Sequence, residues 1–371
     1  MAAPDPTGIF LTAPPGLEGP LADEARAAGF AEVKSHPGGV AVAGGWPEVW
    51  RANLSLRGAS RVLARIGEFR AMHVAQLDKR ARKFPWSDHL RPDIPVRVEA
   101  ACKRSRIYHD RAAAQRVARA ITEELGAPVT ADAALRVMLR IEDDLCTLSL
   151  DTSGEPLHRR GFKQYVGKAA MRETMAALFL RQCGYDGTEP VLDPMCGSGT
   201  FLLEAAEMAT GRAPGRARRF AFEDLASFDA EGWTALREAT VPRTTALTFH
   251  GRDRDAGAIK GARENALRAG VADHCTFAQG AISDLTRPEG PPGLVIVNPP
   301  YGGRVGNKKM IYGLYAALGR VLLDGFSGWR VGLVTTEGGL ARATALPFAP
   351  PGPPVAHGGL KVRLWQTGPL P

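Results

Sequence analysis

The sequence is poor in cysteine and contains no C-x-x-C pair. Its five cysteines are widely scattered: Cys102, Cys146, Cys183, Cys196 and Cys275. An odd number at this spacing argues against a disulfide framework and against a zinc site, and it is typical of a reducing compartment. The eight histidines show no metal-ligand spacing either. We therefore expect no bound metal.

Long apolar runs are also missing. No stretch approaches the roughly 18–20 apolar residues of a membrane span. The start, MAAPDPTGIF, lacks a basic segment followed by an apolar one, so we expect no signal peptide and a cytoplasmic location. With 371 residues and 44% hydrophobic content, the chain is long enough for two or three domains with buried cores.

Positive charge is abundant and unevenly distributed. The formal net charge is +8, yet residues 57–119 alone hold 16 Lys or Arg against 6 Asp or Glu, a net of +10. Aromatic residues stand among these charges in KRARKFPW (79–86) and KRSRIYHDR (103–111). This composition is typical of a surface that binds phosphates and exposed bases, although a solvated helix face is the alternative. The candidate RNA-binding residues are Lys79, Arg80, Arg82, Lys83, Lys103, Arg104 and Arg106.

The first 155 residues alternate strand-like and helical patterns, which predicts an α+β module. Strands are predicted at 8–13, 39–44 and 94–102, helices at 17–28 and 110–125, and a hairpin over 134–154 with its turn at 142–144.

From about residue 160 the pattern changes to repeated strand–loop–helix units, which are typical of an open parallel sheet. The segment 346–359 is rich in proline and glycine and too poor in helix formers for a crossover helix, so we expect the last two strands to be antiparallel neighbours. Strands are predicted at 190–193, 246–250, 274–278, 293–297, 330–335 and 360–365, and helices at 169–182, 200–209, 256–269, 309–323 and 336–345.

The segment EPVLDPMCGSGTFLLEAA (189–206) combines a strand, an acid at its end, a glycine-rich turn and a helix. No lysine follows the glycines, which argues against a triphosphate-binding loop. An acid at the strand end can meet the cationic methionine end of S-adenosylmethionine, while glycine amides approach the carboxylate of that cofactor. A purely structural turn is the alternative, and we interpret Cys196 as packing, not as a nucleophile. The candidate cofactor-binding residues here are Asp193, Pro194, Cys196, Gly197, Ser198, Gly199 and Thr200.

A second acidic pair follows the next predicted strand, in HGRDRDAGAIK (250–260). An acid at this strand end can accept hydrogen bonds from ribose hydroxyls. We expect Asp253 to do so and Asp255 to cap the following helix; the alternative is that both acids are helix caps.

In GLVIVNPPYGG (293–303) an apolar strand ends at Asn298 and two prolines. The Asn298 side-chain oxygen and the Pro299 carbonyl can accept the two protons of an exocyclic base amine, and Pro299 and Pro300 hold these acceptors rigidly. Tyr301 offers a face for stacking of an unpaired base. We therefore predict Asn298, Pro299, Pro300 and Tyr301 as the catalytic residues; the alternative is a proline-terminated strand with a capping asparagine.

DPMCGSGT and NPPY together resemble the class I amino-methyltransferases. The fuller pattern, RRGFKQYVGKAAMRETMAALFL (159–180), DPMCGSGT and NPPYGGRVGNKK, resembles the THUMP-domain RNA guanine-N2 methyltransferases, whose bacterial members act on 23S rRNA. The resemblance implies a Rossmann-like α/β methyltransferase domain (156–371), a ferredoxin-like piece (1–55) and a THUMP-like RNA-binding domain (56–155). It further implies direct methyl transfer from S-adenosylmethionine to guanine N2, without a covalent enzyme intermediate.

One position departs from that family pattern. The family usually has an aspartate after the third strand, where it contacts the adenine amino group. Here FAQGAISDL (277–285) has Gly280 and Ala281 in that neighbourhood. Asp284, from a shifted loop, or a backbone group is the candidate substitute.

Several alternatives remain open at this stage. The RNA could be 23S rRNA, a ribosomal assembly intermediate or tRNA. An adenine-N6 methyltransferase of RNA or DNA would also use an N-P-P-Y segment. A nucleotide-binding oxidoreductase would give that segment no role. An RNA-binding assembly factor that has lost activity is the third class.

Overall fold

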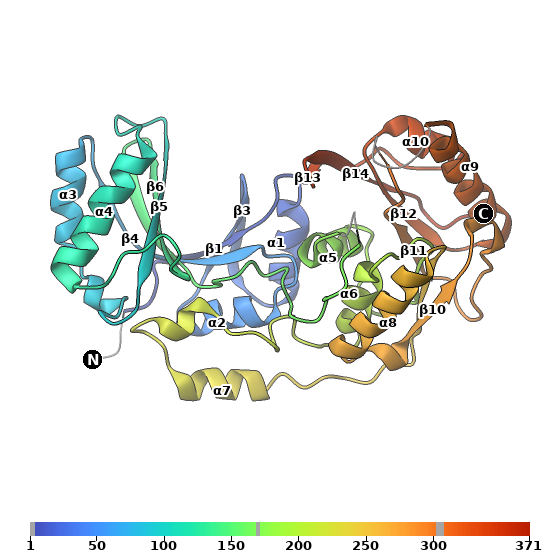
Figure 1. The fold of residues 1–371 in the computed structure, drawn as a ribbon, viewed down its shortest axis with the longest axis horizontal. Coiled ribbons are helices and arrows are strands. Elements are labelled where there is room, and N and C mark those ends of the chain that lie inside the picture. The colour runs from blue at the N-terminus through green and yellow to red at the C-terminus, as the bar shows by residue number, and fades with distance from the viewer. Residues whose placement is uncertain (1–3, 168–170, 302–307) are drawn as a thin grey trace. The chain divides into compact units, whose positions relative to one another are not determined.

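The computed structural model describes residues 4–167, 171–301 and 308–371. These residues form two compact units, each built around its own sheet (Figure 1). Unit 1 takes in the start of the chain up to Ala13, then Ala25–Leu157 and Gly215–Thr240; unit 2 takes in Pro14–Glu24, His158–Pro214 and Val241–Pro371. Neither unit is therefore a continuous stretch of sequence.

The described part of unit 1 contains a seven-stranded sheet in the order β2-β3-β1-β4-β7-β6-β5. Its neighbours are antiparallel except β5 and β6, which are parallel. The strands are β1 (Gly8–Thr12), β2 (Ala31–His36), β3 (Gly39–Ala43), β4 (Arg61–Arg70), β5 (Val96–Lys103), β6 (Leu135–Glu142) and β7 (Leu145–Asp151). The helices in the first 155 residues of unit 1 are α2 (Trp46–Ser55), α3 (Val74–Arg82) and α4 (Asp110–Leu125); most of α1 (Glu18–Ala27) falls in Pro14–Glu24 and so belongs to unit 2.

Residues 215–240 complete the hydrophobic core of unit 1 from far along the sequence. They include α7 (Ala230–Glu238) and bring Phe222 and Trp233 together, with ring centroids 5.0 Å apart. Phe222 also packs against Trp50 of α2, at 6.2 Å. Because aromatic side chains bury large apolar areas, this cluster stabilises unit 1 with residues that no local pattern connects to it.

The described part of unit 2 contains a sheet in the order β10-β9-β8-β11-β12-β14-β13. The first five strands in that order are parallel, and β14 is antiparallel to both β12 and β13. The strands are β8 (Val191–Asp193), β9 (Phe249–Asp253), β10 (Cys275–Gln279), β11 (Leu294–Val297), β12 (Arg330–Thr335), β13 (Val355–His357) and β14 (Leu360–Gln366). The helices are α5 (Glu173–Gln182), α6 (Thr200–Ala209), α8 (Ala256–Ala269), α9 (Lys308–Gly325) and α10 (Gly338–Ala343).

Helices cover both faces of this sheet, as Figure 1 shows: α5, α6 and α8 lie on one face, and α9 and α10 on the other. The central strands are accordingly buried on both sides: every residue of β8 and of β11 is buried. This confirms the predicted α/β fold with a mostly parallel sheet and an antiparallel last strand pair.

Most predicted elements agree with the structure, and α4 and the β6–β7 hairpin match closely. The strand predicted at 246–250 lies three residues too early, because β9 runs from Phe249 to Asp253. Pairing with both β8 and β10 extends the strand through the polar residues 250–253. The helix predicted at 169–182 begins at Glu173; residues 168–170 lie outside the described part. The short strand β13, inside the proline-rich segment, was not predicted.

Within the described ranges, no helix is long and apolar enough to cross a bilayer.

Candidate functional site

The candidate site residues of unit 2 follow neighbouring strands at one edge of the sheet. Asp193 is the last residue of β8, and Asn298 directly follows β11. Val295 pairs with Leu192 in parallel register, so both strands end at the same edge, about 5 Å apart. The chain continues from β8 towards β9 and β10 on one side and from β11 towards β12 on the other. Asp193 and Asn298 therefore flank the topological switch point, where open α/β sheets bind their ligands.

Asp193 is buried, with 3% of its surface exposed. Its Oδ1 accepts a hydrogen bond of 3.1 Å from the backbone N–H of Met195. Burial raises the pKa of Asp193 well above its usual value, and the charge of Asp253 adds to the rise, while the bond from Met195 opposes it. A carboxylate in this position is stabilised by a cationic partner.

The glycine-rich turn between β8 and α6 is held by Asp253. Oδ2 of Asp253 accepts from the backbone N–H of Gly197 at 2.9 Å, and Oδ1 accepts from that of Asp255 at 3.0 Å. Gly197 and Gly199 both have positive φ, +51° and +80°, which favours glycine at these positions. A Cβ at Gly197 would meet no atom within 4 Å, so the backbone faces open space there.

The remaining residues of this turn are packed. The Cys196 thiol is buried, and burial raises its pKa, with the charges of Asp193 and Asp253 contributing, so it is a poor nucleophile. Ser198 and Thr200 contact each other through their hydroxyls at 3.2 Å. Asp255 accepts hydrogen bonds from Gly257 and Ala258 and caps α8, as predicted.

The N-P-P-Y segment leaves the sheet at its carboxyl edge. Asn298 and Pro300 are half-buried and Pro299 is buried. Tyr301 packs against the apolar cluster that contains Leu192, Ile311 and Tyr315. Its hydroxyl is buried without a hydrogen-bond partner among the described residues, and burial raises the pKa of Tyr301 to about 12, so the hydroxyl stays a donor at neutral pH. The continuation GGRVGN (302–307) lies outside the described residues.

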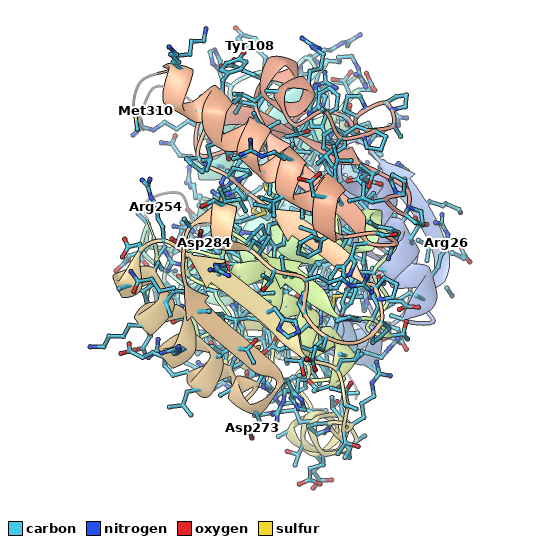
Figure 2. The ribbon with its side chains drawn as sticks, turned by 90° about the vertical axis from the view of Figure 1, so that its right-hand side faces the viewer. Arg26, Tyr108, Arg254, Asp273, Asp284 and Met310 are labelled. Carbon is cyan, nitrogen blue, oxygen red and sulfur yellow. The ribbon has the colours of Figure 1, made fainter. Side chains whose placement is uncertain are left out.

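Gly280, just after β10, lies against the side chain of Arg252. A Cβ at Gly280 would lie 2.2 Å from Nη2 of Arg252, so the guanidinium would have to move to admit a side chain there. Asp284 is exposed and accepts from the Ser283 hydroxyl at 3.0 Å. Figure 2 shows Asp284 towards the same side of unit 2 as Arg254 and Met310.

Residues 158–167, here called the strap, contact the glycine turn, and sequence reasoning missed this role. Nζ of Lys163 donates to Thr200 Oγ1 at 3.3 Å and forms an ion pair of 3.0 Å with Glu173. Asn265 of α8 is fully buried; its amide donates to the carbonyls of Tyr165 and Ser198, and its Oδ1 accepts from the N–H of Gln164 and Tyr165. The only signal in the sequence is that all of the strap except His158 falls inside the segment 159–180 of the family pattern.

We expect Asn265→Ala to destabilise unit 2, because it leaves buried amides and carbonyls of the strap and of Ser198 without partners. Each unsatisfied group costs about 1–3 kcal/mol. Urea unfolding should show a lower midpoint for this variant than for Glu264→Ala, a neighbouring exposed position on α8. An unchanged midpoint would mean that the strap does not depend on Asn265.

The structure separates the basic candidates of unit 1 into two groups. Arg82 of α3 forms ion pairs with Asp78, Glu123 and Glu124, and Arg104 with Glu142 and Asp143. Lys103 and Arg106 lie 3.7 and 3.8 Å from carboxylates. The other three candidates are exposed and have no ion pair within the described ranges: Lys79, Arg80 and Lys83.

Two family models match this sequence. The RMKL-like methyltransferase domain matches residues 160–346, which span the strap, the glycine turn and the N-P-P-Y segment. The RlmL ferredoxin-like domain matches residues 8–63, which run from β1 into β4.

Known proteins are similar over nearly the whole chain. The ribosomal RNA large subunit methyltransferase K/L of Syntrophotalea carbinolica is 38% identical over 91% of this chain and 50% of its own length. The chain thus spans about half the length of the curated relatives that it matches. A crystal structure from Listeria monocytogenes, named as a predicted N6-adenine-specific DNA methylase, is 30% identical with a TM-score of 0.87, over 98% of this chain and 96% of that one. A methyltransferase complexed with SAH is 25% identical with a TM-score of 0.88, over 99% of both chains.

Proposed function

This chain belongs to the RMKL-like methyltransferase family, and on that premise we propose that it is an S-adenosylmethionine-dependent RNA methyltransferase that acts on the exocyclic N2 of a guanosine in 23S rRNA. One observation carries the proposal. The glycine-rich turn after Asp193 and the N-P-P-Y segment follow adjacent strands, β8 and β11, at the switch point of an α/β sheet. The large-subunit rRNA is the substrate given in the names of the curated relatives. Those relatives are about twice as long as this chain, so we propose this substrate for the chain and do not take it over as established.

The residues at the carboxyl edge of β8 and β9 fit S-adenosylmethionine. The buried carboxylate of Asp193 would be stabilised by the methionine ammonium, and the open backbone at Gly197 leaves space for the methionine carboxylate. Asp253 would exchange its bond from the Gly197 N–H for a bond from a ribose hydroxyl. We propose that Asp193, Pro194, Cys196, Gly197, Ser198, Gly199, Thr200 and Asp253 form this cofactor site. The SAH complex of a similar chain supports S-adenosylmethionine as the cofactor, because SAH is the product that S-adenosylmethionine leaves after methyl transfer.

When bound, S-adenosylmethionine supplies an electrophilic methyl group. The protein's part is to hold the amino group of the base. The Asn298 side-chain oxygen and the Pro299 carbonyl accept its two protons, which favours a pyramidal nitrogen whose lone pair is free. Pro300 fixes the direction of the segment, and Tyr301 stacks on the base. For the adenine of the cofactor we propose Asp284, or a backbone group beside Gly280, as the acceptor.

We further propose that residues 56–155 act as a THUMP-like RNA-binding domain, after the ferredoxin-like piece 1–55, and that 156–371, apart from the segment 215–240 that joins unit 1, form the catalytic domain. We also propose that the protein is cytoplasmic and that its partner is ribosomal RNA or a ribosomal assembly intermediate. The exposed Lys79, Arg80 and Lys83 support it, because side chains without carboxylate partners are available to phosphates.

We expect the triple substitution Lys79→Ala, Arg80→Ala, Lys83→Ala to weaken RNA binding and to reduce its salt dependence. The plot of log K against log salt has a negative slope, and each phosphate that is no longer neutralised should reduce its magnitude by about 0.7–0.9. Arg82→Ala is the matched control: its guanidinium is held by three carboxylates, so its removal should affect the stability of α3 and α4 more than the slope. Equal slopes for the triple variant and the wild type would contradict RNA capture by this surface.

A second candidate is methylation of adenine N6, which the Listeria relative's name favours. Mass analysis of nucleosides after reaction with ribosomal RNA, transfer RNA and DNA separates the candidates. We expect N2-methylguanosine from ribosomal RNA. N6-methyladenosine would establish the second candidate, N2-methylguanosine from transfer RNA would change the substrate, and RNA binding without any methylated product would identify an assembly factor.

A further inference from the structure

Glu337 lies just beyond the carboxyl end of β12, the strand next to β11. Val297, the last residue of β11, pairs with Leu333 in parallel register, and Asn298 follows this pair by one residue. Glu337 follows it by four residues on the neighbouring strand, so the two positions differ by three residues along the strands. Since adjacent strands are about 5 Å apart and three extended residues span at most about 11 Å, the backbones of Asn298 and Glu337 are at most about 16 Å apart. The two side chains and one base between them can bridge that distance.

Contacts of the residues on either side hold Glu337 beside the N-P-P-Y segment. Before it, Thr335 Oγ1 accepts from the Tyr315 hydroxyl of α9 at 3.1 Å. After it, a Cβ at Gly339 would lie 2.6 Å from the hydroxyl oxygen of Tyr312, one turn earlier on α9. Tyr315 belongs to the apolar cluster against which Tyr312 and the tyrosine of the N-P-P-Y segment pack. Burial raises the pKa of Tyr315, and the charge of Glu337 adds to this rise, which agrees with the placement.

The Glu337 side chain has no structural task that the described residues reveal. Glu337 is the N-cap residue of α10, yet its side chain makes no hydrogen bond to that helix. Helices favour Ser, Thr, Asp or Asn at this position, so capping does not explain a glutamate. The side chain is exposed and forms no ion pair within residues 4–167, 171–301 and 308–371. Its carboxylate is therefore available to a ligand.

The cofactor site proposed above leaves the β12 side of the sheet edge for the base. Asp193 and Asp253 end β8 and β9, which lie on one side of β11, while β12 lies on the other. A base whose amine is held at Asn298, opposite the cofactor, therefore extends on the side of Glu337. The ring atom next to the amine is the part of the base that a carboxylate there would meet.

We propose that Glu337 selects guanine over adenine, because its carboxylate accepts a hydrogen bond from the N1–H of the base whose amine is held at Asn298. This inference rests on the proposed function, since it assumes that a base amine is the methyl acceptor. Asn298 and the Pro299 carbonyl can accept protons from the amine of either purine, so they do not distinguish the two. In guanine the ring nitrogen beside the amine carries a proton, which a carboxylate binds. In adenine that nitrogen carries a lone pair, which a carboxylate repels.

The test combines a change in the protein with a change in the base. The probe is a 23S rRNA fragment that carries either guanosine or 2-aminopurine at the position that the wild type methylates. 2-Aminopurine keeps the amine of guanine but has no proton on N1. We expect the wild type to prefer guanosine by about 10- to 150-fold in kcat/KM, the usual effect of a hydrogen bond to a charged group.

Three variants of the full chain are compared on both RNAs. Glu337→Ala should lower kcat/KM for guanosine by about 10- to 150-fold and leave 2-aminopurine nearly unchanged, so that the preference is lost. Glu337→Gln should lower guanosine less and improve 2-aminopurine, because an amide can accept from N1–H or donate to an unprotonated N1. Glu289→Gln is the matched control: Glu289 is exposed and precedes β11, at the opposite end of that strand from Asn298, so the preference should stay at the wild-type value.

The outcomes separate this inference from the proposed function. If Glu337→Ala keeps the wild-type preference for guanosine, Glu337 does not bind N1–H, and the inference is wrong while the proposed function stands. If Glu337→Ala loses the same factor on both RNAs, Glu337 supports the fold or the cofactor, and the inference is again wrong. A wild type that methylates no guanosine of 23S rRNA would overturn the proposed function, and the role of Glu337 with it.

Discussion

Asn298→Ala should lower the rate of methyl transfer by roughly 10²–10³, the usual loss when an oriented polar group that stabilises developing charge is removed. The substitution removes an acceptor aimed at the base amine as positive charge develops on its nitrogen. Asn298 is half-buried after the end of β11 and outside the apolar core, so its loss should open no cavity. Single-turnover methylation with saturating cofactor measures the effect on one RNA substrate.

Three further variants sharpen this experiment. Asn298→Asp should be less damaging, because a carboxylate still accepts from the amine, although its charge disturbs a nearby cation. Tyr301→Phe should lose little, since the stacking face remains, whereas Tyr301→Ala should lose roughly 1–3 kcal/mol of base stacking. Thermal unfolding and cofactor calorimetry serve as controls for each protein. If Asn298→Ala transfers methyl groups at the wild-type rate, the N-P-P-Y segment only terminates a strand.

Asp193→Asn should weaken cofactor binding by about 10- to 150-fold, which corresponds to the loss of a hydrogen bond to a charged group. The amide still accepts from the Met195 N–H, so the turn should keep its conformation, but the negative charge opposite the methionine ammonium is gone. Asp193→Ala should weaken binding at least as much. Calorimetry with S-adenosylmethionine is the measurement, and an unchanged affinity in both variants would remove Asp193 from the cofactor site.

The raised pKa of Asp193 also predicts a pH dependence with a definite sign. Its folded pKa lies above the unfolded value near 3.9. The folded state therefore binds the proton more tightly, and stability falls as pH rises from the unfolded pKa through the folded one. Asp193→Asn should abolish this fall and raise the Tm of the cofactor-free protein at neutral pH, although it weakens cofactor binding. Cofactor affinity of the wild type should in turn decrease as pH falls and the carboxyl becomes protonated.

The parallel sheet and the positions of its edge residues could be predicted because each depends on local sequence. β-branched runs form strands, and Asp193 or Asn298 must follow where such a run stops. The end of β9 was misjudged for the same reason: HGRD is polar, and only pairing with β8 and β10 makes it a strand. Gly251 leaves room for the ring of Phe277 on the paired strand, because a Cβ there would lie 2.5 Å from that ring.

The supports of the candidate site could not be predicted, because they depend on contacts between distant residues. Asn265 lies 100 residues from Tyr165 in sequence, and a lone asparagine on a helix carries no pattern. The same holds for Arg82. Composition alone counts it as a free cation, but in the structure it has three carboxylate partners. Charge counts reveal where cations are concentrated, and only packing reveals which of them are neutralised.

The discontinuous composition of unit 1 has a consequence for its biogenesis. Its sheet is complete once Asp151 has been synthesised, but Phe222 and Trp233 join its core only when the ribosome has passed Thr240. At about 5–20 residues per second this delay lasts several seconds. Throughout it, Trp50 has no aromatic partner from 215–240, while the first strand of the second sheet is already emerging. The nascent chain therefore has to keep two unfinished cores apart, and chaperone binding should be strongest in that interval.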